Sequence, residues 1–219
     1  TGGAKVRSFL YNYLQITKEF FIKSKRLIAF ATSVFFMGLF IGVYFFRVDA
    51  ESASRIAQVV IGKFQGMDEV MKDIETPGRI WMIFWNNLRV VLLSFSTGIL
   101  LGIIPVMILF FNGLFIGIIS GMMSSEGIDV IKFFIFGILP HGIFEIPAFI
   151  LGGVMGIKVG IGLIFSPGEK VWLKGLVNLL RDSIVVLTIV LPLLALAAIL
   201  EMTVTSNLVK AVFGSGFLN

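Results

Sequence analysis

Residues 80–123 read IWMIFWNNLRVVLLSFSTGILLGIIPVMILFFNGLFIGIISGMM, and Arg89 is the one charged residue among them. A single α-helix of this length would be about 66 Å long, whereas the hydrocarbon core of a bilayer is about 30 Å thick. We therefore expect two membrane crossings in this stretch. The chain should reverse near Gly102–Pro105, because glycine and proline favour the ends of helices.

The composition of the whole chain agrees with a membrane location. Of the 219 residues, 57% are apolar and 14% are charged, whereas a typical soluble domain has about 25% charged residues. Such a chain cannot bury all of its apolar surface in a water-soluble fold. The sequence predicts a multi-pass protein of the cell membrane that contacts lipid, and it excludes soluble enzyme folds and nucleic-acid binders. The absence of cysteine excludes disulfides and thiolate chemistry.

Three further segments complete the predicted topology. Leu27–Phe46 is an uncharged apolar run that is long enough for the first crossing. Lysines and arginines precede it, and these residues favour the cytoplasmic side, so we expect a cytoplasmic N-terminus. Residues 130–166 form the fourth segment, and Ser183–Leu200 form the last crossing. Five crossings, the favoured number, place the C-terminus outside, whereas six would place it inside.

The fourth segment is too long for one crossing and contains residues that interrupt helices. Pro140, Gly142 and Pro147 are expected to break it. The piece that follows, residues 153–166, is short for a crossing and carries Lys158, which is typical of a re-entrant or interfacial segment. The predicted fold is an all-α polytopic membrane helix bundle with about five crossings, a broken fourth segment and interfacial amphipathic helices.

The chain divides into three predicted regions. Residues 1–26 form a basic, cytoplasmic, interfacial segment, and residues 27–200 form the transmembrane domain. Residues 201–219 form a C-terminal amphipathic segment. The one long polar stretch, residues 47–79, belongs to the transmembrane domain and should lie outside the cell.

Within residues 47–79, apolar residues recur every three or four positions, which predicts an amphipathic helix. The apolar stripe consists of Ile56, Val60, Phe64, Met67 and Met71. One interpretation is a helix that lies on the bilayer surface or on the bundle. The other is a docking surface for an extracytoplasmic envelope protein.

Glycines four residues apart mark the faces on which the predicted helices pack closely, since close backbone approach stabilises helix pairs in lipid. The sets are Gly38 and Gly42; Gly98 and Gly102; Gly113, Gly117 and Gly121; and Gly152, Gly156 and Gly160. This spacing serves contacts within one chain as well as contacts between two copies. We expect a homodimer.

Polar residues in three predicted crossings fall at a similar depth. At 1.5 Å per residue, they lie roughly 9–18 Å below the external boundary of the membrane. They are Asn86, Arg89, Asn112, His141 and Glu145. The simplest arrangement pairs Arg89 with Glu145, because a buried arginine requires a partner or water. Such a layer either fixes the register of the helices or lines a pathway.

The sequence offers few groups for catalysis. A zinc hydrolase requires three protein ligands, and His141 and Glu145 are the two plausible ones in a chain with one histidine. The serines of the crossings do not form a nucleophile elbow, and no phosphate-binding loop occurs. We therefore expect no catalytic residue, no cofactor and no metal.

One motif resembles a known family. Residues 139–148 read LPHGIFEIPA and are followed by Gly152-Gly153, while Asn86-Asn87 and Asn112-Gly113 lie in earlier crossings. In length, hydropathy and motif order, residues 15–205 resemble the stage II sporulation protein M family. The resemblance implies an integral membrane protein with about five crossings. In spore formers, members of that family take part in engulfment of the forespore and are thought to anchor or localise extracytoplasmic peptidoglycan-degrading enzymes.

The resemblance implies a non-enzymatic membrane scaffold that anchors or localises envelope proteins outside the cytoplasm. The residues themselves leave an alternative open, namely a small dimeric transporter, channel or lipid translocator. Helices interrupted by proline and glycine beside polar groups in mid-membrane are typical of transporter substrate sites. An intramembrane hydrolase is a third option.

Overall fold

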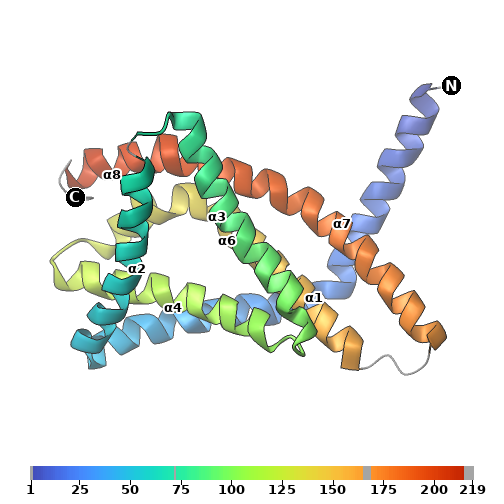
Figure 1. The fold of residues 1–219 in the computed structure, drawn as a ribbon, viewed down its shortest axis with the longest axis horizontal. Helices are drawn as coiled ribbons and strands as arrows, with labels where there is room; N and C mark the ends of the chain where they lie inside the picture. The colour runs from blue at the N-terminus through green and yellow to red at the C-terminus, as the bar shows by residue number, and fades with distance from the viewer. Residues whose placement is uncertain (1, 72, 165–168, 215–219) are drawn as a thin grey trace.

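The computed structural model describes residues 2–71, 73–164 and 169–214, and every regular element in these ranges is a helix (Figure 1). In chain order the helices are α1 (Gly2–Val48), α2 (Ala50–Met71), α3 (Thr76–Ser96), the 3₁₀ helix η1 (Thr97–Ile99), α4 (Ile103–Ser125), α5 (Val130–Lys132), the π-helix η2 (Phe133–Ile138), α6 (Leu139–Ile164), α7 (Glu169–Leu200), the π-helix η3 (Glu201–Thr205) and α8 (Ser206–Phe213). The prediction of an all-α fold is confirmed.

Four helical stretches are long and apolar enough to cross a membrane, as expected of a membrane protein. They are Lys5–Val48, Ile103–Ser125, Val130–Gly162 and Gly175–Phe213. The predicted second crossing, which forms α3, is not among them, since Asn86, Asn87 and Arg89 reduce its apolar character. The fifth crossing, the cytoplasmic N-terminus and the side of the C-terminus stay predictions.

A single helix, α1, contains residues 2–26 of the basic segment and the predicted first crossing. Its 47 residues make it about 70 Å long, more than twice the thickness of the hydrocarbon core. Part of α1 must therefore lie outside the membrane. Figure 1 shows its N-terminal part projecting from the bundle, while its C-terminal part runs beside α4. In the C-terminal segment, η3 and α8 are described, and residues 215–219 lie outside the described residues.

The reversal between α3 and α4 occurs where the sequence predicts it. After η1, Leu101 (φ 57°) and Gly102 (φ 72°) both adopt the left-handed backbone conformation. Glycine tolerates this conformation because it has no Cβ atom. The next helix, α4, begins at Ile103, and Pro105 lies in its first turn, where the missing N–H costs no helical hydrogen bond.

The predicted break of the fourth segment at Pro140, Gly142 and Pro147 is wrong, because α6 is one continuous helix. Pro140 lies at the junction between the π-helix η2 and α6, and Pro147 lies inside α6. The irregular backbone comes just before α6, in the π-helix η2. The re-entrant piece 153–166 is not confirmed, because α6 continues to Ile164 and the last two residues of the piece lie outside the described residues.

The main core lies where α1, α3, α4, α6 and α7 meet. Its best-buried members are at most 1% exposed and include Leu109, Val154, Met155, Val190 and Leu194. Two helix pairs around this core leave no room for a side chain between them. In α1 and α4, a Cβ atom on Gly113 would overlap the carbonyl oxygen of Phe35. In α3 and α6, one on Gly156 would overlap the carbonyl oxygen of Ser94.

Every glycine predicted to pack has atoms of another segment of the chain within 4 Å of the place where its Cβ would stand. These glycines are Gly38, Gly42, Gly98, Gly102, Gly113, Gly117, Gly121, Gly152, Gly156 and Gly160. All of these neighbours belong to the same chain. The homodimer thus stays a prediction, and its sequence argument is weaker because the glycine faces are already occupied.

Helix α2 packs on the bundle. Ala53 and Ala57 are fully buried in a small core with Phe46 and Ile118. Met71, the last residue of the predicted docking stripe, is 6% exposed and lies in a third core cluster. Ile56 is 40% exposed. The side chains of the other three stripe residues, Val60, Phe64 and Met67, lie outside the described part of the structure.

Candidate functional site

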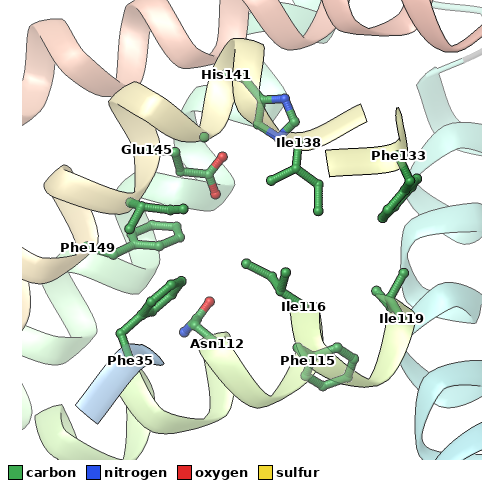
Figure 2. A pocket seen from close by; sticks show the side chains of 12 residues that line it. Phe35, Asn112, Phe115, Ile116, Ile119, Phe133, Ile138, His141, Glu145 and Phe149 are labelled. Carbon is green, nitrogen blue, oxygen red and sulfur yellow. The ribbon is translucent and has the colours of Figure 1, made fainter. Parts of the chain in front are cut away.

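A cavity of about 340 Å³ lies between α1, α4, η2 and α6. We call it the polar chamber, because Asn112, His141 and Glu145 are among its lining residues. Figure 2 shows the Asn112 amide and the Glu145 carboxyl directed into the space from opposite walls. Three of the five residues predicted to form a polar layer thus meet at one cavity.

The other two residues of the predicted layer lie elsewhere. Arg89 is exposed, and its guanidinium carbon stands 5.6 Å from the centre of the Trp85 ring. The Nδ2 atom of Asn86 donates to the Oδ1 atom of Asn87, its neighbour in sequence, over 3.5 Å. In the described structure Arg89 forms no ion pair with Glu145. The reason is the orientation of α3, which turns Leu88, Val91 and Ser94 toward the core and leaves Arg89 on another face.

The side chain of Glu201 lies close to those of His141 and Glu145, and sequence reasoning missed this neighbour. One ligand atom from each of His141, Glu145 and Glu201 lies within 4.8 Å of the other two, and all three residues are half-buried. The prediction of no metal site rests on His141 and Glu145 alone, and Glu201 is a third possible ligand. A glutamate directly after a long apolar run was the available signal, but Glu201 was assigned to the C-terminal segment beyond the last crossing.

Local helix geometry explains how these side chains meet. His141 and Glu145 are four residues apart on α6 and therefore share one face. Glu201 lies on η3, and η2 immediately precedes the turn that carries His141. The two π-helices also contact each other. Such segments are rare and frequently mark functional sites.

A hydrogen bond fixes the position of the His141 ring. The Nδ1 atom lies 3.1 Å from the Oγ1 atom of Thr205, which belongs to η3 and is 5% exposed. Because this bond occupies Nδ1, Nε2 is the ring nitrogen that is left for a ligand. The same bond ties α6 to the helix that carries Glu201.

Two buried aromatic rings bound the polar chamber on the side of the core, and an apolar groove adjoins it. Phe35 and Phe149, which are 1% and 8% exposed, line the chamber (Figure 2). The groove has a volume of about 450 Å³. Chamber and groove share the lining residues Phe35, Ile116, Ile138, Gly142 and Ile146. An acyl chain or another apolar group suits such a groove.

A second polar cluster lies near the C-terminal end of α6. The Lys158 ammonium donates hydrogen bonds to Asp182 of α7 (2.5 Å) and to Ser24 of α1 (3.2 Å). Arg181 donates to Glu19 over 2.9 Å. A cavity of about 360 Å³ adjoins this cluster. Sequence reasoning missed these pairs because the partners come from three helices that are far apart in the chain.

Comparisons with known proteins identify the family of this chain. The family described as "Stage II sporulation protein M" matches residues 31–206. One uncharacterized protein of Methanocaldococcus jannaschii is 28% identical over 197 residues, which cover 88% of this chain and 87% of that protein. A second uncharacterized protein from the same organism is 29% identical over 126 residues, which cover 58% of this chain and 70% of that protein. No solved structure matches. With most of its length matched, this chain belongs to the stage II sporulation protein M family.

Proposed function

We propose that this protein moves cations across the membrane and that the polar chamber is the binding site on their path. The observation that supports this most directly is the convergence of His141, Glu145 and Glu201, whose ligand atoms lie within 4.8 Å of one another. All three belong to stretches that are apolar enough to cross a membrane. Ionisable groups in such stretches cost free energy, so they usually have a function.

The lining of the chamber favours a cation over an anion. No lysine or arginine is among its described lining residues, whereas the Glu145 carboxyl points into it (Figure 2). The Asn112 side chain donates from Nδ2 to the carbonyl oxygen of Ile108 (2.7 Å), which turns the amide oxygen toward the chamber. A carboxylate, an amide oxygen and a neutral imidazole all offer electron pairs to a cation.

Transport requires that the chamber opens on the side of the core. Phe35 and Phe149 lie on that side. We assign them the role of a gate between the chamber and the side of the membrane from which these rings separate it. The π-helix η2 adjoins the chamber, and π-helical turns frequently occur at functional sites, so we assign the movement to this segment. The chamber would then face the two sides of the membrane alternately.

Purified protein in liposomes tests this proposal. Fluxes of Na⁺, K⁺, H⁺ and Mn²⁺ are each measured against liposomes without protein. We expect at least one of these ions to pass faster with the protein present. Glu145→Gln should slow that flux about tenfold or more, the equivalent of about 1.4 kcal/mol in binding. If none of the four ions moves faster than through empty liposomes, the proposal is wrong.

A second candidate is a membrane scaffold for extracytoplasmic envelope proteins, the role that the family resemblance implies. Two exposed apolar residues of α2 favour it: Val59 and Val70 are 65% and 60% exposed. At 100° per residue they lie on one face of the helix. Exposed apolar surface on an external helix suits a protein partner. On this view a partner binds the face with Val59 and Val70, whereas Met71 packs inward.

Cross-linking in membranes tests the scaffold. A photo-reactive residue at position 59 should link to a discrete extracytoplasmic protein, and Val70→Glu should abolish that link. Glu51→Gln, a change at an exposed position of α2, serves as the control and should leave the link intact. If position 59 links to lipid alone, the scaffold loses its support.

A further inference from the structure

We infer that the polar chamber binds a divalent first-row transition-metal ion through His141, Glu145 and Glu201. This inference rests on the proposed function and names its substrate class, an ion such as Mn²⁺, Fe²⁺ or Zn²⁺. The three side chains come from two helical stretches that are distant in sequence, α6 and η3. The fold brings them to one place beside a cavity that has room for an ion and for water.

The distances suit a metal ion. Bonds of about 2.0–2.2 Å from a metal to nitrogen and oxygen place the ligand atoms roughly 3–4 Å apart. The ligand atoms of His141, Glu145 and Glu201 are already within 4.8 Å of one another. Small rotations about the side-chain bonds of the two glutamates therefore complete the site. His141 and Glu145 lie one turn apart on α6, the spacing at which two side chains bind one metal.

The surroundings of His141 also suit a metal ligand. Histidines that bind metal usually donate the other ring N–H to a nearby oxygen, which fixes the tautomer and the direction of the ring. Thr205 supplies this oxygen, since its hydroxyl lies 3.1 Å from Nδ1. The buried hydroxyl thus holds Nε2 available for the metal. Thr205 is on the same π-helix as Glu201, so one short segment supplies a ligand and the group that orients another.

The donor set selects the class of metal. Calcium and magnesium prefer shells made of oxygen alone, and soft ions such as Cu⁺ prefer sulfur. One imidazole with two carboxylates suits Mn²⁺, Fe²⁺, Co²⁺ or Zn²⁺. Three protein ligands leave coordination positions open for water. The Asn112 oxygen, on the opposite wall of the chamber (Figure 2), is placed to contact such a water.

Metal binding is measured on detergent-purified protein that carries no polyhistidine tag and has been stripped with a chelator. Equilibrium dialysis against Zn²⁺, Mn²⁺ or Mg²⁺, followed by mass spectrometry, gives the bound metal per chain. We expect about one Zn²⁺ or Mn²⁺ per chain and much weaker binding of Mg²⁺. Glu145→Gln or Glu201→Gln should weaken binding by more than about a hundredfold, since even changes beyond the ligands cost 10–100-fold. Glu126→Gln, a change at an exposed carboxyl that ends α4, should leave binding unchanged.

A second measurement needs no variant and therefore does not depend on how a variant folds. Pulsed electron paramagnetic resonance of Mn²⁺-loaded protein detects an imidazole nitrogen bound to the metal. The chain has one histidine, so this signal would come from His141. A saturably bound Mn²⁺ without the nitrogen signal would overturn the site.

The outcomes separate the metal site from transport. Stoichiometric binding that both glutamate variants abolish supports the inference. Flux of any tested cation without saturable binding of Zn²⁺ or Mn²⁺ overturns the metal site and leaves transport standing. Binding at the site with no flux supports a metal site and overturns transport.

Discussion

Lys158 of α6 and Asp182 of α7 form an ion pair at 2.5 Å, and their side chains are only 19% and 11% exposed. The same ammonium donates to Ser24, so one cation joins α1, α6 and α7. Removing one partner of a buried pair leaves the other charge without compensation, whereas removing both can be nearly neutral. The pair therefore holds three helices in register.

Breaking this pair should destabilise the protein. Asp182→Asn leaves the Lys158 ammonium without its carboxylate, and we expect a loss of about 3 kcal/mol in the free energy of unfolding. Unfolding in mixed detergent micelles measures this loss. The double change Lys158→Met with Asp182→Leu should recover most of it. Lys23→Met, which removes the exposed pair with Glu19, should cost at most about 1 kcal/mol.

The contact between α1 and α4 depends on glycine. Gly113→Ala places a methyl group against the carbonyl oxygen of Phe35, so the helices must separate. We expect a loss of about 1–3 kcal/mol in the free energy of unfolding, the usual cost of overpacking. Gly62→Ala on α2 is the matched control, because its methyl group would meet nothing within 4 Å. That change should be neutral or slightly stabilising, and equal effects of the two substitutions would contradict the proposed packing.

Water should reach the polar chamber. The chain has no cysteine, so a single introduced thiol reports on one position without background. Asn112→Cys should react rapidly with a small polar thiol reagent in membranes, since Asn112 lines the chamber. Leu109→Cys, at a position of α4 that is 1% exposed, should react at least about tenfold more slowly, because a buried thiol is inert. Similar rates at both positions would show that the chamber is sealed.

Thr205 should tune the proposed metal site through His141. Thr205→Val keeps the size of the side chain but removes the hydroxyl near Nδ1. We expect metal affinity to fall about 10–100-fold, as for other groups that orient a metal ligand. Thr203→Val is the control, since that hydroxyl donates to its own helix at Ile199. Equilibrium dialysis compares the two, and equal losses of affinity would argue against an orienting role.

The sequence was sufficient for the fold class and for the turn at Gly102, because both follow from local properties of the chain. Long apolar runs predict membrane helices, and glycine permits the left-handed turn that precedes Ile103. The break expected at Pro147 is absent, since packing of α6 in the core outweighs the cost of one proline inside the helix.

The site could be predicted only in part. His141, Glu145 and Asn112 could be identified because polar residues are rare in apolar segments. Partner choice depends on how helices rotate against one another, which a single sequence does not specify. For that reason the sequence predicts Arg89 as the partner of Glu145, whereas in the structure Glu201 lies beside Glu145 and Arg89 lies over Trp85.

The central claim is that the chamber around Glu145 carries cations across the membrane. Its most direct test is the rate of Mn²⁺ uptake into liposomes that contain equal amounts of wild-type protein, Glu145→Gln or Glu126→Gln, each checked for folding by its helical spectrum. The account predicts that wild type and Glu126→Gln take up Mn²⁺ faster than empty liposomes do. The rate for Glu145→Gln should be lower than the wild-type rate by a factor of about ten or more. Mn²⁺ uptake above that of empty liposomes but equal for all three proteins, or no uptake of Mn²⁺, Na⁺, K⁺ or H⁺ above that of empty liposomes, would contradict it.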